Sequence, residues 1–185
     1  MALDIVRLHG TRIDLDILET DEESIQLYTK WANDEYINMW IHGNDEIHSV
    51  ASERQWATSA NNSENSNQSY NFTIVEKSSR NQIGTCSCGI WGNARNATLG
   101  IYIGDENGRG KGYGTEAVKL LVMFCFEELN AHRVELSVFT DNEKAIKCYK
   151  KVGFKDCGVR HECSYFGGKY RDLMYMEILK REWKG

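Results

Sequence analysis

The 185-residue chain contains no proline. Helix ends and turns therefore have to be assigned from glycines, capping residues and hydrophobic periodicity. The chain also has no apolar run near the ~18 residues that a membrane-spanning helix needs. Met1–Ile5 lacks the basic and apolar regions of a secretory signal. We therefore expect a cytoplasmic protein that does not enter a membrane.

The chain has no excess of positive charge. It carries 22 Lys and Arg against 27 Asp and Glu, a net charge of −5, which argues against binding to nucleic acid or an anionic membrane. The charge is unevenly distributed, because residues 1–60 have 12 acidic and 4 basic side chains whereas residues 61–185 have 15 and 18. The first part could face a cationic partner and the second a polyanion, although a solvated acidic surface explains the first part equally well.

The six cysteines and five histidines lack the spacing of metal ligands. Cys86 and Cys88 form a C-x-C, and Cys157, His161 and Cys163 lie close together. Neither group has the paired C-x-x-C or H-x-x-x-H spacing of a zinc site. We expect no metal ion, and without a secretion signal we expect reduced thiols.

Hydrophobic periodicity predicts one domain over residues 1–185, with its core at about 9–180. The expected strands cover residues 11–18, 70–76, 82–91, 97–103, 133–139, 154–162 and 169–179, and the expected helices cover 21–33, 50–59, 115–129 and 142–151. A polar loop is expected at 61–69. This order is typical of an α/β (α+β) fold in which a mixed, mostly antiparallel sheet of about seven strands is flanked by about four helices.

A glycine-rich segment, residues 109–114 (Arg-Gly-Lys-Gly-Tyr-Gly), joins an expected strand to the apolar helix 115–129. Glycines let backbone amides approach a ligand and converge on it, and the first helical turn adds N–H groups and a positive dipole end. Arg109 and Lys111 add positive charge. The glycines fit neither of the two common phosphate-loop patterns. The segment is therefore either a pyrophosphate site or simply a tight turn.

A second motif follows on the next strand and helix. The pattern N-x-x-A-x-x-x-Y-x-x-x-G-F is formed by Asn142, Ala145, Tyr149, Gly153 and Phe154, downstream of R-x-x-G-x-G at 109–114. The two motifs, in this order and spacing, resemble those of the GCN5-related N-acetyltransferase (GNAT) superfamily. The segments 31–34 (Trp-Ala-Asn-Asp), 112–117 and 168–172 (Gly-Lys-Tyr-Arg-Asp) resemble, within it, the ribosomal-protein-alanine acetyltransferase (RimJ/RimL-like) branch, which also contains polyamine and antibiotic acetyltransferases.

This resemblance implies a GNAT-like domain in which the fourth expected strand splays from the fifth. It also implies that acetyl-CoA is the acetyl donor, without a metal ion, and that a primary amine attacks it directly. The implied coenzyme-binding residues are Ile101, Tyr102, Ile103, Arg109, Gly110, Lys111, Gly112, Tyr113, Gly114, Thr115, Asn142, Lys144 and Ala145. Tyr149 is the candidate general acid for the departing thiolate, because the ordinary pKa of a phenol lies near that of a thiol. The alternative is that Tyr149 is a core aromatic.

The acceptor amine is expected to be a protein N-terminus or a small cationic molecule such as a polyamine. Candidate acceptor-binding residues come from the acidic and aromatic early segment: Trp31, Asp34, Glu35, Tyr36 and Trp40, with Asp45 and Glu46 as further acids. Many relatives carry a glutamate at the position of Thr98, so no general base is assigned. A non-catalytic acyl-CoA-binding module of the same fold is the alternative function, and a homodimer is a candidate assembly.

Overall fold

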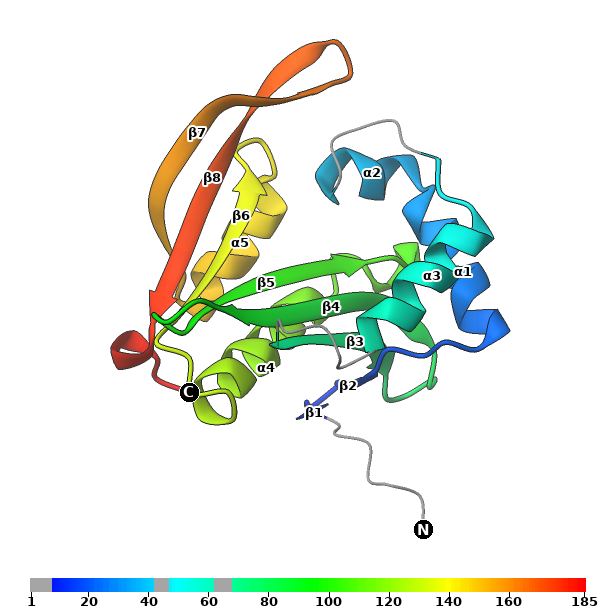
Figure 1. The fold of residues 1–185 in the computed structure, drawn as a ribbon, viewed down its shortest axis with the longest axis horizontal. Coiled ribbons are helices and arrows are strands. Elements are labelled where there is room, and N and C mark those ends of the chain that lie inside the picture. The colour runs from blue at the N-terminus through cyan, green and yellow to red at the C-terminus, as the bar shows by residue number, and fades with distance from the viewer. Residues whose placement is uncertain (1–7, 42–46, 62–67) are drawn as a thin grey trace.

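Eight strands form one open sheet in the order β1-β2-β3-β4-β5-β6-β8-β7 (Figure 1). The computed structural model describes residues 8–41, 47–61 and 68–185. Met1–Ile5, most of the expected polar loop, and the expected acceptor residues Asp45 and Glu46 lie outside the described residues. The strands are β1 (Leu8–His9), β2 (Ile13–Ile17), β3 (Gln68–Glu76), β4 (Gln82–Trp91), β5 (Asn96–Ile103), β6 (Arg133–Phe139), β7 (Lys155–Phe166) and β8 (Lys169–Leu179).

Five α-helices are present in the described part of the chain. They are α1 (Glu22–Ala32), α2 (Glu35–Ile41), α3 (Val50–Asn61), α4 (Tyr113–Glu127) and α5 (Glu143–Val152), and two short 3-10 helices, η1 (Glu106–Gly108) and η2 (Lys180–Glu182), follow β5 and β8. The predicted fold class is confirmed, with one strand and one helix more than expected. The additional elements are β1, which pairs antiparallel with β2, and α2.

Helix α2 was not predicted because it is short and has only one fully buried residue, Ile37. Its start is fixed by Asp34, whose side chain accepts a hydrogen bond from the Ile37 backbone N–H at 3.0 Å. Aspartate is a favoured residue at a helix N-terminus for this reason. The cap places the aromatic residues of α2 opposite the ends of β5 and β6.

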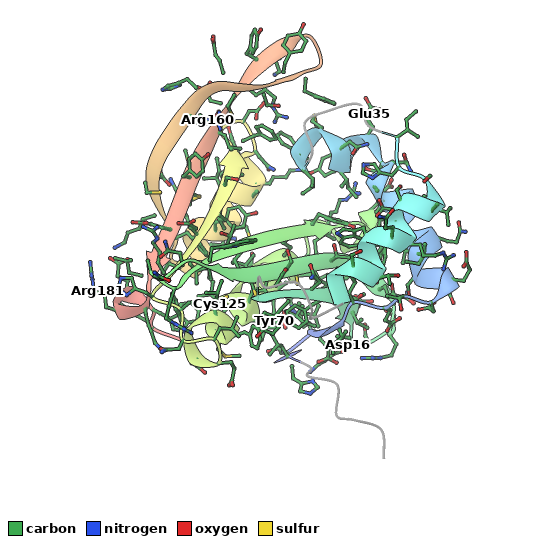
Figure 2. All side chains as sticks on the ribbon, viewed as in Figure 1. Asp16, Glu35, Tyr70, Cys125, Arg160 and Arg181 are labelled. Atoms are coloured by element: carbon green, nitrogen blue, oxygen red, sulfur yellow. The ribbon has the colours of Figure 1, made fainter. Side chains whose placement is uncertain are left out.

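Two layers of helices cover the sheet. Helices α4 and α5 pack on one face, where the apolar side of α4 joins residues of β2 to β6 and β8 in the main core. Tyr70 of β3, labelled in Figure 2, meets Phe124 of α4 edge to face with ring centroids 5.2 Å apart. Helices α1, α2 and α3 form a smaller core on the other face, around Tyr28, Trp31 and Ala57. The sheet is thus held on both faces.

The predicted splay lies between β5 and β6, which are the fourth and fifth of the strands expected from sequence. The two strands are parallel and pair at only three positions, the last of which joins Thr98 to Glu135. Beyond this point β5 stays paired with β4 and β6 stays paired with β8. Figure 1 shows the two strands diverging, with α2 facing the gap. Within the described ranges, no helix is both long and apolar enough to cross a membrane.

The burial of α4 gives a first testable prediction. Leu121 has no exposed surface in the main core, so we expect Leu121→Ala to lower the free energy of unfolding by about 2–5 kcal/mol through lost burial and a residual cavity. Lys119→Ala, at an exposed position of the same helix, should change it by less than about 0.5 kcal/mol. Urea unfolding followed by circular dichroism measures both. Equal effects of the two substitutions would contradict the assigned core.

Candidate functional site

A groove of about 640 Å³ lies where β5 and β6 separate. One wall is α2, the floor includes β5 and Val118 of α4, and the other wall runs from the end of β6 into α5. The glycine turn closes one end. All of the predicted coenzyme-binding residues except Lys111 line this groove, together with Tyr149, Tyr36 and Trp40. The structure therefore brings the two sequence motifs together around one cavity.

The glycine turn leaves backbone amides available at the start of α4. Gly110 and Gly112 have φ values of +76° and +86°, a conformation that residues with a side chain rarely adopt. Gly112 is the residue before α4 and makes no side-chain cap. The first N–H groups of a helix have no partner within the helix. With no capping side chain, these amides and the positive dipole end can bind an anion such as a pyrophosphate.

Of the two basic residues of the turn, Lys111 does not line the groove, and Arg109 lines it but is already engaged by other groups. The guanidinium of Arg109 donates to the carbonyl oxygens of Ile103 and Gly104 at 3.1 and 2.9 Å and lies 3.6 Å from a carboxylate oxygen of Asp34. It also stacks on the Tyr36 ring, with its central carbon 4.6 Å from the centroid. Arg109 thus ties the end of β5 to α2. The side chain of Arg109 is therefore already engaged, and the backbone amides are the groups of the turn that remain available to an anion.

Arg12 supports the turn from outside the groove, and no local sequence pattern predicted this role. Its Nη1 donates to the Lys111 carbonyl at 2.8 Å, and its Nε and backbone N–H donate to the Glu116 carboxylate at 3.0 and 2.7 Å. Its guanidinium also lies over the Tyr113 ring at 5.0 Å. Burial opposes the ionisation of Glu116, but the bonds from Arg12 lower its pKa overall. The charged pair holds the turn against the start of α4.

Helix α5 is capped by Asn142, the first residue of the expected helix, and contributes the second motif. Asn142 accepts a hydrogen bond from the Ala145 N–H at 3.2 Å, and Gly153 ends the helix with φ +113°. Thr115 in the first turn of α4 donates to the Cys148 Sγ at 3.2 Å. This contact fixes α5 beside the glycine turn. The side chain of Asn142 serves as a helix cap, and Asn142 also lines the groove.

Tyr149 belongs both to the core and to the groove. It is 9% exposed and packs against Phe154 with ring centroids 6.0 Å apart. Burial, with a smaller contribution from Cys148, raises the pKa of Tyr149 well above its ordinary value. The phenol is therefore protonated throughout the physiological pH range. Both interpretations drawn from the sequence, a core aromatic and a group at the site, describe where this side chain lies.

The floor strand β5 presents its two faces differently. Ile101 and Ile103 pack against the main core, whereas Tyr102 packs against the smaller core beside Trp31. On the side toward β6, the backbone of β5 has no strand partner after Thr98. Unpaired strand backbone can hydrogen-bond an extended ligand in the manner of an added strand. The residues Ile101, Tyr102 and Ile103, which the family resemblance implies as coenzyme-binding, lie on this stretch of β5.

The predicted acceptor residues divide between two places. Tyr36 and Trp40 line the groove. Trp31 and Asp34 instead line a separate cleft of about 670 Å³ beside α1 and the end of β5, where the buried Trp31 ring lies against Gly104. Glu35 is at the exposed start of α2, as labelled in Figure 2, and lines neither cavity. Asp34 and Glu35, the acidic residues of this set that the structure describes, are therefore not brought to the groove.

Arg171 of β8 joins the two walls of the groove. Its side chain is only 3% exposed, and it donates to the Met39 carbonyl at 2.5 Å and to the Asp141 carboxylate at 2.6 Å. Its guanidinium stacks on the rings of Trp40 and Phe139. Met39 and Trp40 are in α2, whereas Asp141 precedes the Asn142 cap. One buried cation therefore fastens the aromatic wall to the start of α5.

At the mouth of the splay the structure places Glu135 directly opposite Thr98. In a parallel pair, opposed residues point to the same face of the sheet. Glu135 forms an ion pair with Arg133 at 3.0 Å, and Arg133 also pairs with Glu177 at 3.2 Å. This carboxylate is engaged by a cation, so the geometry alone does not assign it as a base. In the described part of the chain, no three His, Cys, Asp or Glu side chains are grouped to hold a metal ion.

Comparisons with known proteins agree with this geometry. A model of the acetyltransferase (GNAT) domain matches residues 12–155. This chain belongs to the GNAT acetyltransferase family. Among curated relatives of this GNAT protein, it is 37% identical over 91 residues to the putative ribosomal N-acetyltransferase YdaF of Bacillus subtilis (strain 168), a match covering 49% of each chain. It is 36% identical over 89 residues to the spermidine N(1)-acetyltransferase of Escherichia coli (strain K12), covering 48% of this chain and 47% of that one.

The chain thus spans about half the length of these two curated relatives. A solved structure covers more of the molecule. The spermidine N-acetyltransferase of Vibrio cholerae, in complex with CoA and spermine, superimposes on 92% of this chain and 97% of its own with a TM-score of 0.81, at 22% sequence identity. At this identity the match supports the GNAT fold of the chain.

The contacts of Arg12 predict that it supports anion binding without touching the ligand. We expect Arg12→Met to weaken the binding of CoA about tenfold, equivalent to about 1.4 kcal/mol, because the glycine turn loses its tie to β2. Titration calorimetry measures the dissociation constant. Arg54→Met is the matched control, since Arg54 is also a surface arginine paired with a glutamate, Glu22. Unchanged CoA binding by Arg12→Met would refute this role.

Proposed function

We propose that this protein transfers the acetyl group of acetyl-CoA to a primary amine by direct attack of the amine nitrogen. The observation that carries the proposal is the single groove in which unpaired β5 backbone, an uncapped helix start and a protonated phenol meet. The turn amides would hold the pyrophosphate, and the β5 backbone would hold the pantetheine arm. A backbone N–H near 101–103 would polarise the thioester carbonyl, as donors aimed at developing negative charge do.

In this reaction the amine lone pair forms a bond to the carbonyl carbon, the carbon–sulfur bond breaks, and the thiolate takes a proton. We assign that proton to Tyr149, which lines the groove and stays protonated because burial raises its pKa. Burial in the groove also disfavours the thiolate form of the coenzyme. The pKa values of the phenol and of the leaving thiol therefore stay close to each other, which suits proton transfer between them. The proton lost by the amine passes to water, and no side chain is assigned as the base. The Tyr149 phenolate regains a proton from water, which restores the enzyme for the next turnover.

The described lining of the groove favours a peptide N-terminus as the acceptor over a polyamine. It contains no Asp or Glu, and the lining cation beside its aromatic wall is Arg109. The aromatic faces of Tyr36 and Trp40, which could stack on an ammonium group, are each contacted by an arginine. A polyamine carries several positive charges and would meet no carboxylate among these residues. A peptide carries its single amine next to neutral backbone.

The acceptor is tested by a screen that compares spermidine, an aminoglycoside and short peptides with free N-termini. We expect kcat/KM for the best peptide to exceed that for spermidine by at least about tenfold. Release of free CoA, followed with a thiol reagent, reports turnover. Preference for spermidine would overturn the choice of acceptor. Binding of acetyl-CoA without turnover of any amine would favour the alternative, a non-catalytic acyl-CoA-binding module.

The proposal also includes the cellular setting. The name of one relative refers to the ribosome and that of another to spermidine, and both kinds of amine are found in the cytoplasm, where we place the reaction. All six cysteines are free thiols, in keeping with a reducing compartment. A homodimer remains the candidate assembly.

Removal of the Tyr149 hydroxyl tests its role directly. We expect Tyr149→Phe to lower kcat by about 100-fold or more, the usual size of a general-acid effect, while the KM for acetyl-CoA stays within about twofold, because the ring still packs against Phe154. Tyr165→Phe, at an exposed position of β7 that does not line the groove, is the control. Full turnover by Tyr149→Phe would remove this residue from the mechanism.

The direction of the pKa shift of Tyr149 predicts the alkaline side of the pH profile. A raised pKa keeps the proton-donating form fully populated above the ordinary phenol value of about 10. We therefore expect kcat of the wild-type enzyme to show no loss between about pH 8 and pH 10. Initial rates at saturating substrate measure it. An alkaline decline centred below about pH 9 that disappears in Tyr149→Phe would contradict the shift.

A further inference from the structure

Three lysines of α5 lie on the face of the helix that lines the groove. They are Lys144, Lys147 and Lys151, spaced three and four residues apart, which places them on one side of a helix. The motif predicted only Lys144 as a coenzyme contact. Lys150 does not line the groove and pairs instead with Asp156 at 3.0 Å. We name Lys144, Lys147 and Lys151 the lysine stripe.

The middle of the lysine stripe lies beside the start of α4, which follows the glycine turn. The contact between Thr115 and Cys148 joins the first turn of α4 to the middle of α5. With a rise of 1.5 Å per residue, the stripe extends over roughly 10 Å of helix in total, and this contact lies within that length. A ligand whose pyrophosphate lies on the turn would therefore have its next charged group within reach of these flexible side chains.

In the described lining of the groove, the lysine stripe provides the positive charges that other groups of the protein do not already neutralise. The fourth basic residue, Arg109, is engaged by the carbonyls at the end of β5 and by Asp34. Lys147 pairs with Glu143 at 3.1 Å, but both side chains are more than 70% exposed, and such a surface pair is worth little. No Asp or Glu of the described residues lines the groove to neutralise the stripe. It is therefore suited to a dianion.

We propose that the lysine stripe binds the phosphate monoester on the ribose of coenzyme A, so that the protein distinguishes acetyl-CoA from its 3′-dephospho form. This inference rests on the proposed use of acetyl-CoA. The coenzyme has two phosphate groups, and the turn amides account for the pyrophosphate. The ribose 3′-phosphate is the remaining charged group. Lysine ammonium groups act as mobile point charges, which suit a freely rotating phosphate monoester better than a planar carboxylate.

The test compares CoA with 3′-dephospho-CoA by titration calorimetry on the full chain. We expect the wild-type protein to bind CoA about tenfold or more tightly than 3′-dephospho-CoA at low salt. The double variant Lys147→Gln/Lys151→Gln should lose most of this preference by weakening CoA binding, with binding of 3′-dephospho-CoA within about twofold of wild type. Lys150→Gln is the matched control and should retain the preference. Raising the salt from about 0.05 to about 0.5 M should reduce the preference of the wild type, because exposed charges are screened.

The outcomes separate this inference from the proposed function. Equal binding of the two ligands by the wild type would overturn the subsite and leave the acetyltransferase proposal intact. Weakening of both ligands to the same extent in the double variant would show that the lysines act on the pyrophosphate, which also overturns it. Failure of the wild type to bind either ligand would refute the proposed function itself. Circular dichroism confirms that the variants, altered only at exposed positions, are folded.

Discussion

The groove depends on a parallel ladder that ends after three residue pairs. Up to Thr98 and Glu135, β5 and β6 satisfy each other's backbone groups, and beyond that point they do not. Backbone N–H and C=O groups without a partner must be satisfied by water or by a ligand. The gap persists because each strand keeps its other neighbour and because the buried helix α4 packs against both strands. The sheet therefore supplies an open strand edge inside a rigid fold.

Arginine side chains then fix the elements that surround this edge. Arg12, Arg109 and Arg171 each donate to main-chain carbonyls of a segment that lines the groove, and each is paired with a carboxylate. A guanidinium can do this because its five donors lie in a planar fork and its faces stack on aromatic rings. The turn, the end of β5 and helix α2 are thus positioned by side chains that need not touch a substrate. The amides and the phenol that would do so are left unobstructed.

The sequence predicted the parts of the site that are continuous in the chain. The glycine turn, the Asn142 cap and the position of Tyr149 follow from local patterns, and the apolar character of α4 predicted its burial. Helix α2 could not be predicted, because its seven residues are held by the Asp34 cap and by Arg171, which is 132 residues from Met39. For the same reason Arg12 gave no signal. Trp31 and Asp34 matched a family pattern, but the fold turns them toward another cleft, and only tertiary contacts decide that direction.

The position of Arg171 has a consequence for the order in which the groove is completed. Its strand, β8, inserts between β6 and β7 and is the last strand of the sheet in chain order. During synthesis, α2 and the β5 edge emerge long before the side chain that anchors α2 to the start of α5. A nascent chain therefore contains most of the residues that line the groove but lacks the link between its two walls. The two walls of the groove are therefore joined only after the C-terminal hairpin of β7 and β8 has folded onto the sheet.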